Sequence, residues 1–130
     1  MSAPITGIYA ALAAILLVVL TLRVIILRRR HKIGIGTGQQ PELAQAVRAH
    51  GNFIEYVPLA LLLLALAETG GSGARLIHAC GAALIACRLL HAWGLTSSPG
   101  KSPGRFIGMV GTLLVMLVLA VTLLLAAARA

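Results

Sequence analysis

The residues best suited to chemistry lie in a stretch that begins charged and becomes apolar, RAHGNFIEYVPLALLLL, residues 48–64. Arg48, Asn52 and Glu55 follow one another at i, i+4 and i+7, so in a helix they lie within about 60° of one another on one face. A charge carried into a lipid-facing helix costs roughly 2.5 kcal/mol or more, and such residues normally face a bundle interior or a wet cavity. The sequence therefore predicts a functional polar stripe formed by these three residues.

Other apolar stretches also carry basic residues near one end. Arg88 and His91 stand at i, i+3 on one helical face, and Arg105 stands at the start of the last apolar stretch. Arg23 precedes the basic cluster that follows the first stretch, and it is either a site residue or an arginine that snorkels to the interface. His91 is either structural or functional, and the arginine beside it gives more weight to a function.

The elements that must position these residues are four hydrophobic spans. The chain has 130 residues, of which 59% are hydrophobic and 11% are charged, whereas a soluble domain carries about 25% charged residues. Four segments of about 20 residues, each long enough to cross a ~30 Å hydrocarbon layer, use nearly the whole chain. We expect an all-α membrane protein with one domain, residues 1–130, folded as an antiparallel bundle of four transmembrane helices at about 5–30, 41–68, 74–96 and 104–128.

The net charge of +8 points to the membrane and not to nucleic acid. Most Lys and Arg residues stand at the ends of spans, where they meet lipid headgroups or orient the protein. We therefore expect no nucleic-acid partner, and we expect no metal site. The connections after the first and third spans hold most of these residues, so the positive-inside rule predicts that this side is cytoplasmic and that both termini lie outside.

Antiparallel packing brings the candidate residues to that same side. Guanidinium groups from all four spans would then face one acid, Glu55, and a partly buried cluster with excess positive charge requires a counter-ion. The expected ligand is small and multiply charged, with carboxylate or phosphate groups that match the guanidinium fork. Asn52 and Glu55 would add acceptors for an ammonium or amide, and a neighbouring copy of the chain would complete the shallow pocket. Gly104, Gly108 and Thr112, spaced by four, predict close packing of the last helix.

The sequence resembles the bacterial branch of the MAPEG superfamily, the membrane-associated proteins of eicosanoid and glutathione metabolism. The resemblance covers essentially the whole chain and rests on RVIILRRRHKIGIGTG, PELAQAVRAHGNFIEYVPLALLLLALAE, RLLHAWGL and PGRFIGM. It implies a four-helix bundle assembled as a homotrimer in the bacterial inner membrane, with glutathione bound between subunits near the cytoplasmic end.

The resemblance also implies roles for single residues. Arg105 matches the arginine beside the sulfur in the family's transferases, where it would stabilise the nucleophilic thiolate. Three positions depart from the family pattern: Leu95 and Met109 stand where several mammalian members have tyrosine, and Phe106 stands where a serine could donate to sulfur. The implied glutathione-contacting residues are Arg23, Arg48, Asn52, Glu55, Arg88 and His91.

Two functions from different classes follow. The first is a glutathione transferase or peroxidase that acts on small lipophilic electrophiles from the lipid bilayer. The departures near Arg105 favour glutathione binding over strong catalysis. The second is a non-catalytic binding or scaffold protein whose pocket holds the headgroup of an anionic lipid.

Overall fold

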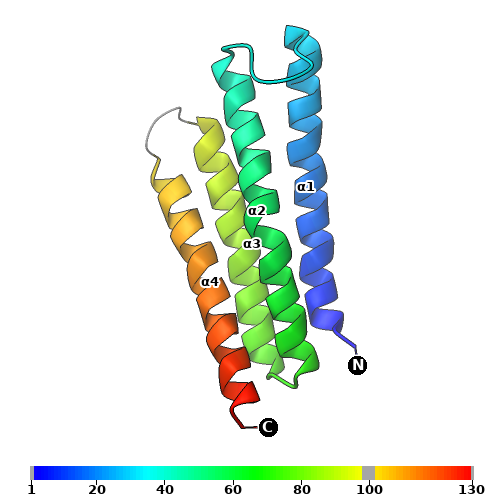
Figure 1. The fold of residues 1–130 in the computed structure, drawn as a ribbon, viewed down its shortest axis with the longest axis vertical. Coiled ribbons are helices and arrows are strands. Elements are labelled where there is room, and N and C mark those ends of the chain that lie inside the picture. Colours follow the sequence, from blue (N-terminus) through cyan, green and yellow to red (C-terminus); the bar gives the residue numbers. More distant parts are fainter. Residues whose placement is uncertain (1, 98–101, 130) are drawn as a thin grey trace.

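The chain folds into an antiparallel helical bundle (Figure 1). The computed structural model describes residues 2–97 and 102–129. Each helix end lies within one residue of the range expected from the sequence, and the two ends of the described chain lie at the same end of the bundle. The described residues form four helices: α1 (Pro4–His31), α2 (Pro41–Thr69), α3 (Ala74–Ser97) and α4 (Pro103–Ala127).

Local sequence explains where the helices start and stop. Pro4, Pro41 and Pro103 open α1, α2 and α4, where a residue without an N–H loses no helical hydrogen bond. The end of α1 is marked by Lys32 in the left-handed conformation, at φ 56°, with its N–H directed to carbonyl groups of the last turn. Basic residues in that turn also suit the negative end of the helix dipole: Arg28, Arg29, Arg30 and His31.

All four described helices are long and apolar enough to cross a membrane. The helix α3 packs against each of the other three, while α1 and α4 both pack on α2 and α3. In the most hydrophobic windows of α1 and α4, 17% of residues are buried, so these outer helices turn most of their apolar surface outward. That surface suits contact with lipid tails or with another copy of the chain.

Glycines let α4 lie directly against α3. A Cβ atom added at Gly108 would lie 2.5 Å from the carbonyl oxygen of Cys87 and 2.7 Å from the backbone nitrogen of His91. The buried face of α4 includes Gly104, Gly108 and Thr112, the small residues whose spacing predicted close packing. The two backbones therefore approach closely just where His91 and Arg105 stand.

At the opposite end of the bundle, a carboxylate of α2 binds the start of α1, a contact that the sequence did not reveal. The Glu68 carboxylate, at the end of α2, accepts the backbone N–H groups of Ile5 at 2.9 Å and Thr6 at 2.7 Å. These two groups belong to the first turn of α1, where backbone donors have no partner within the helix. One turn further along α1, the Tyr9 hydroxyl lies 2.9 Å from His78 Nδ1 and ties α1 to α3.

Candidate functional site

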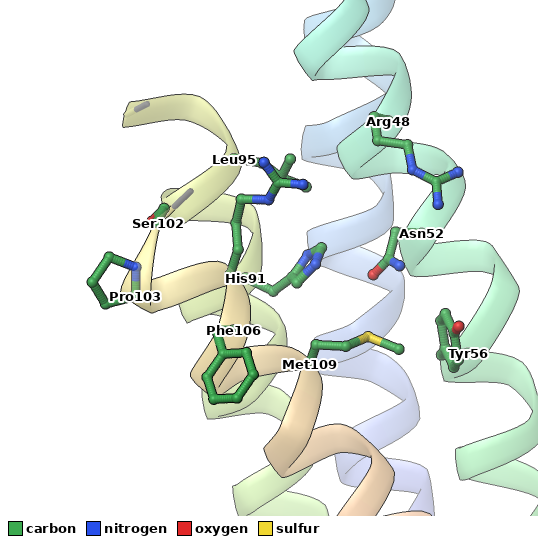
Figure 2. Close-up of a pocket in the computed structure, with 10 residues that line it drawn as sticks. Arg48, Asn52, Tyr56, His91, Leu95, Ser102, Pro103, Phe106 and Met109 are labelled. Atoms are coloured by element: carbon green, nitrogen blue, oxygen red, sulfur yellow. The ribbon is translucent and has the colours of Figure 1, made fainter. Parts of the chain in front are cut away.

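A cleft of about 750 Å³ opens between α2, α3 and α4, toward the end of the bundle that carries the α1–α2 connection. Figure 2 shows the side chains that surround it. Two of its walls are polar and one is apolar, so the cleft is amphipathic. The lining residues are Arg48, Asn52, Tyr56, His91, Leu95, Ser102, Pro103, Arg105, Phe106 and Met109.

The helix α2 supplies one polar wall. Arg48, Asn52 and Tyr56 are spaced by four residues and therefore share one helical face. Asn52 is buried, with 7% of its surface exposed, whereas the Arg48 side chain is 63% exposed. Arg48 Nη1 donates to Glu55 Oε1 at 3.4 Å, and this pair stands on the flank of α2.

The opposite polar wall comes from α3 and α4. His91 is 8% exposed, and Figure 2 shows its ring directed toward Asn52 across the cleft. Arg105 stands in the first turn of α4, close to the backbone of Gly94 in α3. The glycine contacts between these two helices hold His91 and Arg105 on the same wall.

The apolar wall belongs mainly to α4. Phe106 is 71% exposed, and the Met109 side chain reaches from α4 toward Tyr56 (Figure 2). Leu95 adds a buried apolar surface from α3. A ligand with a charged part and an apolar part could thus bind a polar wall and the apolar wall of the same cleft.

Arg88 lies behind this cleft and does not belong to its lining. Only 1% of its surface is exposed, and its Nη1 donates to Asn52 Oδ1 at 3.0 Å. Within the described residues, the Arg88 Nε and Nη2 atoms have no hydrogen-bond partner. Arg88 therefore reaches the cleft through Asn52.

The structure brings together some of the predicted site residues and separates others. Arg48, Asn52, His91 and Arg105 line one cleft, while Glu55 is joined to it through Arg48. The expectation that guanidinium groups of all four helices meet is corrected for Arg23.

Arg23 lines a second cleft of about 390 Å³, with Arg30 of the same helix and Glu42 of α2. The physical reason is the packing of the bundle. In the described part of the chain, α1 and α4 both pack on α2 and α3, but α1 and α4 do not contact each other. A single chain thus joins three helices, and not four, around the main cleft.

Two hydroxyl groups in the cleft were missed by sequence reasoning. Tyr56 follows Asn52 by four residues, and this spacing could have revealed that Tyr56 shares a helical face with Arg48 and Asn52. Ser102 precedes α4 as its N-cap residue, and its side chain makes no capping hydrogen bond to the helix. Only the tertiary structure shows that Ser102 lies beside Arg105 in the cleft lining.

Comparison with known proteins adds an independent line of observation. Residues 6–125 match the MAPEG family. The chain is also 38% identical over 90 residues to the inner membrane protein YecN of Escherichia coli strain K12, an alignment that covers 69% of each chain. The YecN protein of Escherichia coli O6:H1 strain CFT073 matches with the same identity and coverage.

Proposed function

The chain belongs to the MAPEG family, and from this premise we propose that it is a glutathione-binding membrane protein that acts as a glutathione transferase or peroxidase. Its substrates would be small lipophilic electrophiles that reach the cleft from the bilayer. The single observation that carries the proposal is the amphipathic cleft, which is lined both by Arg48 and Arg105 and by the apolar side chains of Phe106 and Met109.

The excess of positive charge near the cleft supports an anionic ligand. The chain has three acids, and two of them stand elsewhere: Glu68 binds the start of α1, and Glu42 lines the second cleft. The remaining acid, Glu55, pairs with Arg48, whereas Arg105 also lines the cleft and Arg88 lies behind it against Asn52. This partly buried excess of positive charge favours a counter-ion. Glutathione has two carboxylates for the guanidinium groups, an ammonium for Glu55 and a thiol.

The chemistry would centre on Arg105. A guanidinium beside the thiol favours the thiolate, which is the nucleophile. The sulfur would then attack an electrophilic carbon held against Phe106 and Met109, forming an S–C bond while a leaving group such as chloride departs. With a lipid hydroperoxide as the substrate, two glutathione molecules would instead be oxidised to the disulfide while the peroxide is reduced to an alcohol and water.

We expect a homotrimer with one such site at each boundary between subunits. The support is that Arg48 and Glu55 leave 63% and 48% of their side chains exposed on a membrane-spanning helix. An exposed ion pair in lipid is costly, and a neighbouring subunit would cover it. Native mass spectrometry of the detergent-solubilised protein should give three chains, and a monomer at all concentrations would contradict this assembly.

We also expect the cleft to face the cytoplasm of a bacterial cell, with both termini outside the inner membrane. The support is the basic cluster at the end of α1, Arg28, Arg29, Arg30 and Lys32, at the cleft end of the bundle. A reporter enzyme that is active only outside the inner membrane, fused to the C-terminus, should be active.

The decisive test of function is calorimetric titration of glutathione into the purified protein in lipid nanodiscs. We expect binding that Arg105→Ala weakens by on the order of 30-fold or more, because a charged hydrogen-bonding group is lost from the site. Arg75→Ala is the control, because Arg75 is an exposed arginine at the opposite end of the bundle. Absence of binding, or equal effects of both substitutions, would refute the proposal.

One observation favours a non-catalytic lipid-binding or scaffold protein as the second candidate. Directly after Arg105, the apolar Phe106 occupies the position where a hydroxyl could assist the sulfur. In this case the cleft would hold the headgroup of an anionic lipid. Phosphatidylglycerol retained in a fixed ratio through purification, with no thiol consumed when a chlorinated aromatic electrophile is added, would support this candidate over the transferase.

A further inference from the structure

The hydrogen bond between Arg88 and Asn52 can have only one direction, with Arg88 as the donor. A guanidinium group only donates hydrogen bonds, so the Asn52 atom that lies 3.0 Å from Arg88 Nη1 is the carbonyl oxygen Oδ1. Asn52 lines the cleft while Arg88 does not. With the oxygen engaged behind the wall, the group that Asn52 offers to a ligand is its N–H₂.

We propose that Arg88 is a positioning residue that locks the Asn52 amide with its N–H₂ group toward the cleft. In this proposal Asn52 is a donor for a carboxylate of the ligand, in place of the acceptor for an ammonium or amide that was expected from the sequence. It also changes the role expected for Arg88, which acts on the ligand through Asn52 and not by contact. The inference rests on the proposed function, since the ligand is taken to be glutathione.

The burial of Arg88 supports a positioning role. Arg88 is 1% exposed, and its Nε and Nη2 atoms have no partner in the described part of the chain. A buried cation with incomplete hydrogen bonding contributes little to stability, and apolar residues of similar size often replace such groups without loss. Without Arg88, nothing at this contact would distinguish the two orientations of the amide, because the oxygen and nitrogen ends of Asn52 have nearly the same shape.

The test is a double-mutant cycle in which glutathione affinity is measured for four proteins in nanodiscs: wild type, Arg88→Met, Asn52→Ala and the double variant. Methionine keeps an unbranched side chain without charge. Each single substitution should weaken glutathione binding by about five- to ten-fold, the effect of one lost hydrogen bond. If Arg88 acts through Asn52, the double variant should bind no more weakly than Asn52→Ala alone. If the fold-losses in affinity of the two single variants multiply in the double variant, the positioning role of Arg88 is refuted.

Two further variants separate positioning from stability. Arg88→Lys should recover part of the affinity, because an ammonium also donates without accepting. Leu84→Ala is the matched control, since Leu84 is a buried residue one turn before Arg88 in α3. It should lower the unfolding temperature and leave the dissociation constant within about two-fold. A similar loss of affinity in Leu84→Ala would show that Arg88→Met merely loosens the bundle.

The same four proteins distinguish failure of the lock from failure of the proposed function. If the wild type does not bind glutathione, the proposed function fails, and unfolding temperatures then decide whether the lock exists. Asn52→Ala leaves a buried guanidinium without its acceptor, so Arg88→Met should raise the unfolding temperature in the Asn52→Ala background. Independent effects of the two substitutions on unfolding would reject the lock regardless of the ligand.

Discussion

Gly108 of α4 lies directly against the backbone of His91 in α3. A Cβ atom at Gly108 would stand 2.7 Å from the His91 nitrogen and 2.8 Å from the His91 Cβ, distances too short for a methyl group. Because Arg105 lies one turn before Gly108 on the same helix, this contact also fixes where Arg105 stands relative to His91. The polar wall of the cleft therefore depends on a glycine that does not line it.

Gly108→Ala should impair both folding and binding. The added methyl group would meet backbone atoms that cannot rotate away, so we expect a loss of about 1–3 kcal/mol in stability and a weaker affinity for glutathione. Thermal unfolding and calorimetry in nanodiscs measure the two effects. Gly7→Ala is the control, because nothing lies within 4 Å of the position of its added Cβ. Equal outcomes for the two variants would contradict the close packing.

Glu55 should select for the free amino group of glutathione. If its carboxylate binds the ammonium, the wild type should bind N-acetylglutathione more weakly than glutathione by on the order of ten-fold or more. In Glu55→Gln this preference should largely disappear, because the charged acceptor is lost. Calorimetric titration of both ligands into both proteins gives the comparison. A preference that survives the substitution would assign the ammonium to another group and leave Glu55 only as the partner of Arg48.

Ser102 should support catalysis more than binding. Its hydroxyl lines the cleft near Arg105 and makes no capping bond to α4, so it could donate to a thiolate where Phe106 cannot. We expect Ser102→Ala to slow thiol consumption with a chlorinated aromatic electrophile by on the order of ten-fold, the effect of one hydrogen bond to a charged group. Glutathione affinity should change by less than about two-fold. Ser102→Thr, which keeps the hydroxyl, should retain most of the activity.

Glu68→Gln should loosen the start of α1 without affecting the cleft. The carboxylate holds the N–H groups of Ile5 and Thr6, and an amide would accept them without the favourable charge. Hydrogen exchange at these two amides should accelerate, while glutathione affinity should stay at the wild-type value because Glu68 lies at the other end of α2. Unchanged exchange would show that the rest of the α1 contact suffices to hold this turn.

The fold follows closely from local sequence. Four long apolar segments, separated by short connections rich in glycine and proline, leave few alternatives to four membrane-spanning helices, because backbone groups in lipid must bond within their own helix. The spacing of Gly104, Gly108 and Thr112 likewise identified the packed face of α4. The sequence could not show that Glu68 holds the first turn of α1, since that contact joins residues 62 and 63 positions apart.

The residue types of the candidate site were determined by the sequence alone, because a polar or charged side chain inside an apolar helix is costly and can be recognised without coordinates. Arg48, Asn52, His91 and Arg105 were identified in this way, and they share one cleft. Only the tertiary structure decided which residues lie behind the cleft or outside it. Arg88 is buried against Asn52, and Arg23 faces a different cleft. The physical reason is that helical periodicity fixes which residues share a face, whereas the rotation of each helix in the bundle is set by side-chain packing between helices.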